Sequence, residues 1–204
     1  MNAGLITSYI IAGILLISML AMNIRVSQSS AEITLTQITR EKADAISDMI
    51  YDDIPNMGYD TEGKTSEIIT VADEHKVTFY RKIDPADTGD PEEITWELTD
   101  EEIPSTKNPD DRVLVRIVDS DTTKITLGVT RFEIWYFDDF GLSTLPEDNE
   151  YLPRPVVSSQ LTDIKQLYIA LELESAEQIY TGPGGTGRYI RTAWEKRYSP
   201  GNIE

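Results

Sequence analysis

The side chains that could do acid–base or metal chemistry are few in kind. His75 is the only histidine and there is no cysteine, so the chain cannot supply a zinc site or a reactive thiol. Ser-His-Asp catalysis would rest on this one imidazole, which lies in a polar connector between expected strands. Paired carboxylates such as Glu101 and Glu102 occur in turn-like surroundings, where no apolar pocket is expected to raise one pKa. We therefore expect no enzymatic activity, and an anchored hydrolase has almost no residue support.

Calcium is the one cofactor for which the sequence offers ligands. Ca²⁺ prefers hard oxygen ligands, and carboxylates gather in expected turns at Asp119, Asp121, Asp138 and Asp139. These residues do not have the spacing of an EF-hand. The four aspartates are candidate calcium ligands, and acidic turns exposed to solvent are the alternative interpretation.

A glycine-rich stretch at residues 182–187 has some features of a phosphate-binding loop. It lacks the lysine that follows in a P-loop, and it opens onto a strand-like segment instead of a helix. A hairpin loop is the better interpretation.

The formal net charge of −18 limits the class of partner. The acidic residues are spread from Glu32 to Glu204 and are not gathered in a tail. Such a surface repels phosphate backbones and anionic lipid headgroups, so we expect no direct nucleic-acid ligand. A solvated acidic surface and an acidic binding face both remain open.

The first 24 residues predict a membrane-spanning helix. Every residue before Arg25 is uncharged, and at ~1.5 Å per residue the apolar run Leu5–Met22 would span roughly 27 Å of hydrocarbon. A cleaved signal peptide is the alternative, but the basic start and small-residue cleavage site are missing. We expect a retained single-pass anchor facing lipid. Ala12, Gly13 and Ser18 are small enough to allow close helix packing.

Residues 25–56 predict an amphipathic continuation of the same helix. Apolar residues, including Ile38, Met49 and Ile54, recur at helical spacing and are expected to enter a core. Pro55 followed by Gly58 ends the pattern. The helix therefore has a membrane part, residues 1–24, and a soluble part, residues 25–56.

Residues 57–204 predict an antiparallel, β-rich globular domain. Short runs with β-type composition alternate between apolar and polar residues and are separated by turn residues, with no intervening helical repeat. The runs are 67–72, 76–83, 94–99, 113–118, 124–127, 129–137, 166–174 and 188–198. Residues 142–160 read as a long loop. A sheet with one apolar face needs a cover, and only the amphipathic helix is long enough to supply it. The expected class is α+β.

Three segments carry a resemblance to a known family. Asp52–Tyr59 resembles the Asp-Ile-Arg-x-Ala-Gly-Tyr signature of minor pilins, with Pro55 in place of Arg. Gly128–Gly141 resembles their Gly-Val-x-x-Phe strand and turn, and Ile164–Glu174 with Arg191–Asn202 resembles their closing strand pair and Pro-Arg-Asn ending. Together these segments make the chain similar to the W-type minor pilins of type IV pili and the J-type pseudopilins of type II secretion.

The resemblance implies a function in filament assembly. It implies a minor pilin or pseudopilin that initiates or caps a type IV pilus or secretion pseudopilus, with its domain outside the inner membrane. Partners would be other pilin-like subunits, an inner-membrane assembly platform and a prepilin peptidase. The helix surface between Leu5 and Met22 would face lipid first and other subunits after assembly. A singly anchored extracytoplasmic module that binds a ligand through its acidic surface is the alternative.

The N-terminus departs from the family pattern. Gly4 would be the glycine before the peptidase site and Leu5 the first mature residue, but the basic leader and the glutamate at the fifth mature position are missing. In the family, that glutamate is thought to neutralise the amine of a neighbouring subunit. We expect a subunit without it to sit at the filament tip, where no neighbour lies above it.

Overall fold

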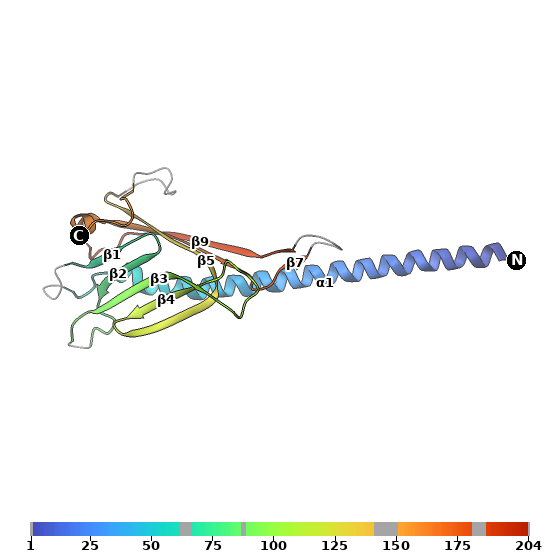
Figure 1. The fold of residues 1–204 in the computed structure, drawn as a ribbon, viewed down its shortest axis with the longest axis horizontal. Helices are drawn as coiled ribbons and strands as arrows, with labels where there is room; N and C mark the ends of the chain where they lie inside the picture. The colour runs from blue at the N-terminus through green and yellow to red at the C-terminus, as the bar shows by residue number, and fades with distance from the viewer. Residues whose placement is uncertain (1, 62–66, 87–88, 141–150, 181–186, 204) are drawn as a thin grey trace.

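A single long helix leads into a β domain in the computed structural model, which describes residues 2–61, 67–86, 89–140, 151–180 and 187–203. The helix, α1 (Asn2–Asp53), is unbroken over 52 residues and passes into a 3-10 turn, η1 (Ile54–Asn56). Pro55 lies in this turn, where its missing N–H prevents the α-helical ladder from continuing. The two chain ends lie at opposite ends of the molecule (Figure 1).

Seven strands form one antiparallel sheet in the order β1-β2-β3-β4-β5-β6-β9. They are β1 (Ile69–Ala72), β2 (Lys76–Arg81), β3 (Glu92–Glu102), β4 (Arg112–Val118), β5 (Asp121–Phe137), β6 (Gln166–Glu174) and β9 (Arg191–Tyr198). A separate two-stranded ribbon pairs β7 (Ile179–Tyr180) with β8 (Gly187–Arg188). The expected α+β class, with a long N-terminal helix and an antiparallel sheet, is confirmed.

The sheet bends at Gly128, in the middle of the 17-residue strand β5. The first part of β5 pairs with β4 and the second part with β6, and both pairings shift register near this residue. Gly128 has φ +91°, a conformation that costs glycine little. The sequence predicted two strands, 124–127 and 129–137, separated at this glycine. That prediction is wrong, because the chain bends at Gly128 without leaving the sheet.

The bend curls the sheet into a half-barrel. The second part of β5 returns to the β1–β2 turn, where the Ile134 N–H donates to the Glu74 carbonyl at 2.9 Å. His75 lies in the same turn, with Nδ1 2.9 Å from the Phe132 carbonyl oxygen. The imidazole therefore helps to hold this turn against β5.

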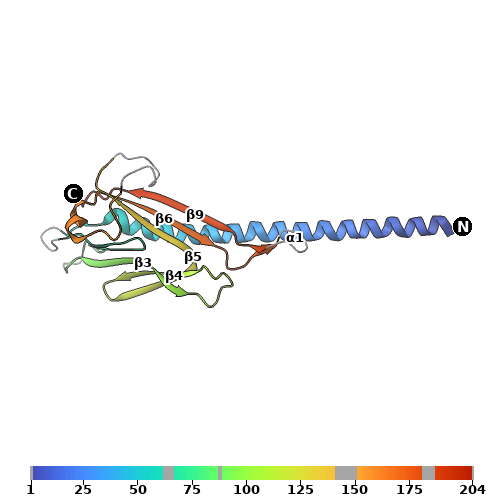
Figure 2. The ribbon, with the colours of Figure 1, turned by 45° about the horizontal axis from the view of Figure 1, so that its top comes forward.

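The C-terminal part of α1 fills the concave side of the half-barrel (Figure 2). Ala43, Ile46, Ile50 and Ile54 are buried in one cluster with residues of the large sheet. Burying each isoleucine contributes about 1.5–3 kcal/mol relative to leaving it exposed. Met49 packs at the edge of this core, but Ile38, which the sequence placed in it, is 42% exposed.

Two expected loops are only partly described. In the predicted loop 142–160, residues 142–150 lie outside the described residues, and the end of the segment enters a 3-10 helix, η3 (Ser158–Asp163). Of the glycine-rich loop 182–187, only Gly187 is described, in β8. The predicted strand 188–198 is divided between β8 and β9.

Replacing Gly128 with alanine is expected to destabilise the domain by about 2 kcal/mol or more. A Cβ at this position would lie 2.5 Å from the Glu174 carbonyl oxygen and would need a positive φ. Urea unfolding of the detergent-solubilised full chain, followed by tryptophan fluorescence, measures the effect. Gly201→Ala is the control, because nothing lies within 4 Å of its Cβ position, and it should stay within about 0.5 kcal/mol of wild type. Equal stability of the two variants would contradict the bend model.

Candidate functional site

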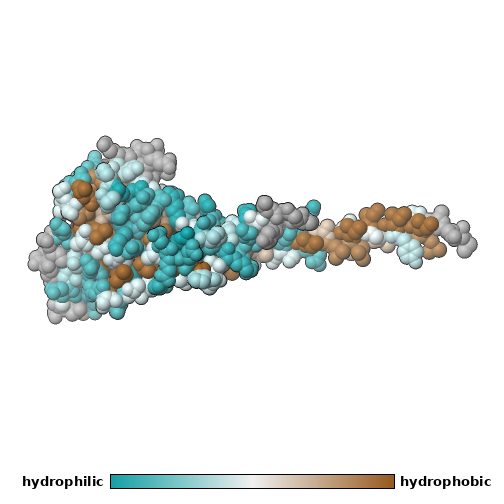
Figure 3. Space-filling view, in the orientation of Figure 1, coloured by the Kyte–Doolittle hydropathy of each residue, from teal (hydrophilic) through white to brown (hydrophobic). Residues whose placement is uncertain are grey.

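The N-terminal half of α1 exposes a long run of apolar side chains. The large apolar side chains between Leu5 and Met22 are between 53% and 75% exposed, and they form a continuous hydrophobic band along the helix (Figure 3). This is one helix long and apolar enough to cross a membrane. It has the properties of a single membrane anchor, and an N-terminal signal sequence shares them.

The structure places the predicted anchor residues along this helix. Gly4 and Leu5 lie near its start, and no heavy atom comes within 4 Å of the Cβ position of Gly4 or Gly13. At about 100° of rotation per residue, Ala12, Gly13 and Ser18 point in directions roughly 100–140° apart. The three small residues therefore do not share one packing face in a straight helix.

A groove runs between α1 and the β7 strand where the apolar half meets the domain. It has a volume of about 1100 Å³ and is lined by Met19, Met22, Val26 and Leu35 of α1 and by Ile179 of β7. An ion pair between Arg188 of β8 and Glu32 of α1 lies at the same end of the domain. The sequence did not predict this groove, because β7 and β8 are too short to give a strand pattern.

A buried ion cluster holds the other end of α1 to the sheet. The Asp53 side chain is fully buried and accepts hydrogen bonds from Trp96 Nε1 at 2.8 Å and from Arg116 Nε and Nη2 at 2.6 and 2.8 Å. Arg81 Nη2 lies 3.1 Å from Asp53 Oδ1. We call these four residues, Asp53, Arg81, Trp96 and Arg116, the junction cluster.

The junction cluster also places a positive charge at the C-terminal end of α1. The last carbonyls of a helix carry partial negative charge, which cations stabilise. Arg81 donates to the main-chain carbonyl of Asp52 and, at 2.7 Å, to its carboxylate. The hydrogen bonds that Arg116 donates to Asp53 raise the pKa of Arg116. Because the three partners of Asp53 come from β2, β3 and β4, the cluster fixes the direction of α1 relative to the sheet.

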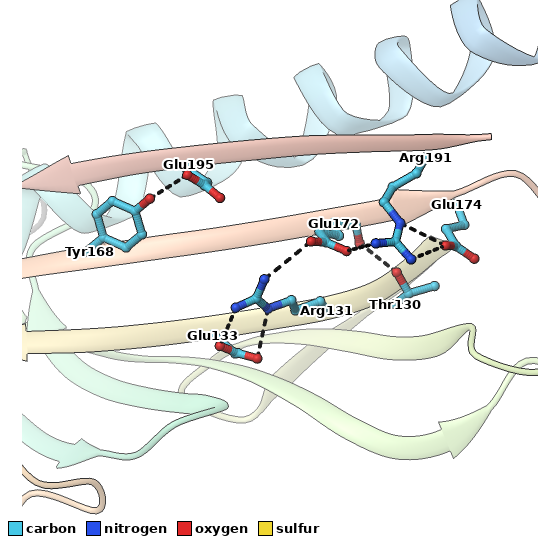
Figure 4. Close-up of polar contacts among 8 residues, drawn as sticks. All are labelled: Thr130, Arg131, Glu133, Tyr168, Glu172, Glu174, Arg191 and Glu195. Atoms are coloured by element: carbon cyan, nitrogen blue, oxygen red, sulfur yellow. Dashed lines mark hydrogen bonds and ion pairs between the residues drawn. The ribbon is translucent and has the colours of Figure 1, made fainter. Parts of the chain in front are cut away.

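A second charged network covers the face of β5, β6 and β9 that points away from the core (Figure 4). Arg131 makes a two-point contact with Glu133, both at 2.8 Å, and reaches Glu172 at 3.3 Å. Arg191 bonds Glu174 at 3.0 Å and pairs with Glu172 at 3.4 Å. These charges satisfy one another across strands, which identifies the network as a stabilised solvent-facing surface.

The ionisation of this outer face follows from the contacts. The Arg131 guanidinium lowers the pKa of Glu133. Burial, followed by a 2.5 Å hydrogen bond to Glu195, raises the pKa of Tyr168 to about 12. Both residues therefore keep their ordinary charge states at neutral pH.

The candidate calcium ligands do not converge. Asp119 and Asp121 lie where β5 begins, whereas Asp138 and Asp139 follow its last residue, so the whole strand separates the pairs. Asp119 instead accepts a hydrogen bond from the main-chain N–H of Glu93. Within the described ranges, no three His, Cys, Asp or Glu side chains form a group that could hold a metal ion. Calcium binding at these aspartates stays an untested prediction.

Comparisons of the chain with protein-family models, curated proteins and solved structures found no match. The function must therefore be inferred from the residues and geometry of this chain.

Replacing Asp53 with alanine is expected to destabilise the protein by about 3–5 kcal/mol, because Arg81 and Arg116 would keep buried charges without their partner. Urea unfolding followed by tryptophan fluorescence measures the loss. The matched control is Asp52→Ala, since the Asp52 side chain is 69% exposed, and its expected cost is below about 1 kcal/mol. Similar losses in both variants would show that the junction cluster does not hold the helix end.

Glu133→Gln should reduce stability by less than about 1 kcal/mol at neutral pH, because the carboxylate and Arg131 are partly exposed. Since the pKa of Glu133 is lowered by folding, its contribution is present above the ordinary pKa of 4.5 and is lost as the pH falls through the lowered value. Unfolding measured from pH 7 to pH 3 should show the difference between variant and wild type closing. In an Arg131→Gln background the same substitution should have little effect at any pH. A difference that grows in acid would refute the assignment.

Proposed function

We propose that this protein is a single-pass membrane subunit that assembles through α1 with other pilin-like chains, as a minor pilin of a type IV pilus or a pseudopilin of type II secretion. The observation that supports this most is the continuity of α1. One end of the helix is buried under the sheet, while its apolar half is exposed to a partner that must itself be apolar.

The physical basis is an exchange of one apolar environment for another. Lipid chains and neighbouring helices both cover the band between Leu5 and Met22, so transfer from bilayer to helical bundle leaves no apolar surface in water. The junction cluster then matters mechanically. Because it ties the end of α1 to three strands, a displacement of the helix carries the domain with it.

The segments that carry the family resemblance meet in the folded chain, which supports the proposal. Asn202 of the C-terminal segment donates to the Met57 carbonyl at 3.3 Å across 145 residues of sequence. A Cβ at Gly58, where φ is +72°, would lie 2.7 Å from the Asn202 main-chain oxygen. The helix-end signature and the chain ending therefore fit each other closely, and Asp53 of that signature anchors the junction cluster.

The atypical N-terminus favours a position at the filament tip. A mid-filament subunit of the family uses a buried charge pair with its neighbour, and this chain lacks the glutamate for it. In this proposal the domain lies outside the inner membrane, and an assembly platform and other minor subunits are its partners.

Disulfide crosslinking tests the proposal, because the chain has no native cysteine. Val26→Cys lies on α1 just beyond the apolar band, and Val157→Cys lies on the domain with matched exposure, 59% and 57% for the native side chains. In cells that carry paired cysteines in co-expressed pilin-like chains, the variant at position 26 should crosslink to such a chain at least tenfold more than the variant at position 157.

The control separates helix assembly from general proximity. Equal crosslinking at both positions, or none to any pilin-like chain, would overturn assembly through α1. The second result would favour the alternative, an anchored module that binds its ligand through the acidic domain surface.

A further inference from the structure

Asp111 is a buried acid that the fold leaves without a partner. Its side chain is 1% exposed, and neither carboxylate oxygen has a hydrogen-bond partner. A buried ionised carboxylate without hydrogen bonds is costly. Such a group in a native protein calls for an explanation such as a bound ion or an ordered water.

The loop that carries Asp111 is fixed by hydrogen bonds to neighbouring elements, which keep the Asp111 side chain buried. This loop connects β3 to β4 and docks on the end of β6, where the Lys107 N–H donates to the Ala176 carbonyl at 3.2 Å. Tyr189 also donates its hydroxyl to the Lys107 carbonyl at 2.8 Å. The Asp111 N–H bonds back to the Asn108 carbonyl at 3.4 Å.

The donors around Asp111 are used on other acceptors. Asn108 Nδ2 donates to Glu174 Oε2 at 2.9 Å, and Arg191 donates to Glu174 Oε1 at 3.0 Å. The Thr106 hydroxyl bonds the main-chain oxygens of Ile103 and Asn108 at 3.4 and 3.3 Å. Both carboxylate oxygens of the neighbouring Glu174 are therefore hydrogen-bonded, whereas neither carboxylate oxygen of Asp111 is.

Oxygen atoms and negative charge surround the orphaned carboxylate. Gly128 has no Cβ atom. A Cβ there would lie 2.5 Å from the Glu174 main-chain oxygen and 3.7 Å from Asp111 Oδ1, so both oxygens face the same small space. Burial raises the pKa of Asp111; the Thr106 hydroxyl and Lys42 oppose this, while Glu174 and Asp110 add to it. The nearby cations are engaged elsewhere or act only from a distance: Arg112 bonds the main-chain oxygen of Asp111, and no hydrogen bond reaches the carboxylate among the described residues. The carboxylate, carbonyl and hydroxyl oxygens at this place suit a hard cation.

We propose that Asp111 is the anchoring ligand of a site for one hard cation, calcium or sodium, with the Glu174 main-chain oxygen and the Thr106 hydroxyl as neutral oxygens beside it. The cation supplies the direct partner that the Asp111 carboxylate does not have within the described residues. It ties the β3–β4 loop to the end of β6, on the side of the domain from which β7 and β8 reach α1. This site is distinct from the aspartates at the two ends of β5.

Thermal unfolding of the full-length protein in detergent, stripped with EDTA, tests the site. Calcium chloride is the first probe, and sodium chloride against choline chloride at equal ionic strength is the second. At about one hundred times its dissociation constant, the bound ion should raise the Tm of wild type by about 5 °C. Calorimetric titration should give one equivalent.

Matched variants locate the ion. Asp110→Asn, next in the chain and exposed, should respond to the ion like wild type, whereas Asp111→Asn should show no shift. In EDTA, Asp111→Asn should melt at or above the wild-type temperature, because it removes an unpaired buried charge. This comparison also shows that the variant is folded.

Three results would overturn the proposal. The first is a wild-type protein that neither ion stabilises. The second is an Asp111→Asn variant that responds like wild type, or a response that is lost instead in Asp119→Asn or Asp138→Asn. The third is an Asp111→Asn variant that melts well below wild type in EDTA, since Asp111 would then have a partner within the protein.

Discussion

The buried carboxylate of Asp53 constrains the rest of the structure, because a charge in the interior must be met by groups that are fixed in place. Its partners Arg81, Trp96 and Arg116 belong to three successive strands. The strands must therefore be in register and the helix must end where it does for the charge to be satisfied. Apolar packing along α1 would tolerate a small rotation or slide of the helix, whereas this geometry would not. The cluster thus contributes position more than net stability.

A fixed helix end gives the exposed half its direction. Since α1 has no break between Asn2 and Asp53, whatever covers the apolar band acts on the same rigid element that fills the half-barrel. The curvature of the sheet serves this arrangement, because the bend at Gly128 lets β6 and β9 lie along the helix while β2, β3 and β4 reach its end. The charged pairs on the outer face make the other side of β5 and β6 polar, so that it can face water.

Sequence patterns predicted the elements better than their partners. The uncharged start, the helical spacing up to Ile54 and the alternation in the strands depend on local chemistry, and the α+β class followed from them. The residues that act over long sequence distances were missed. In the sequence, Asp53 is only part of the helix-end motif, because Arg81 and Arg116 come beside it only in the folded chain. Asp111 is likewise one of several acidic residues in an expected turn. The prediction that Ile38 is buried was wrong for the same reason, because helical spacing does not tell how far a sheet extends along a helix.

The same distinction separates the two kinds of acid in this protein. Most carboxylates of the described residues are exposed or partly exposed, so the charge of −18 can be read as a solvated surface. Asp53 and Asp111 are both buried, yet the fold treats them oppositely: it brings two guanidinium groups and an indole to Asp53 and none to Asp111. Folding alone accounts for the first, because all its partners are in the chain. For the second, oxygen atoms of the chain surround the carboxylate but no group of the described residues bonds to it, and we therefore look for its partner in the medium around the protein.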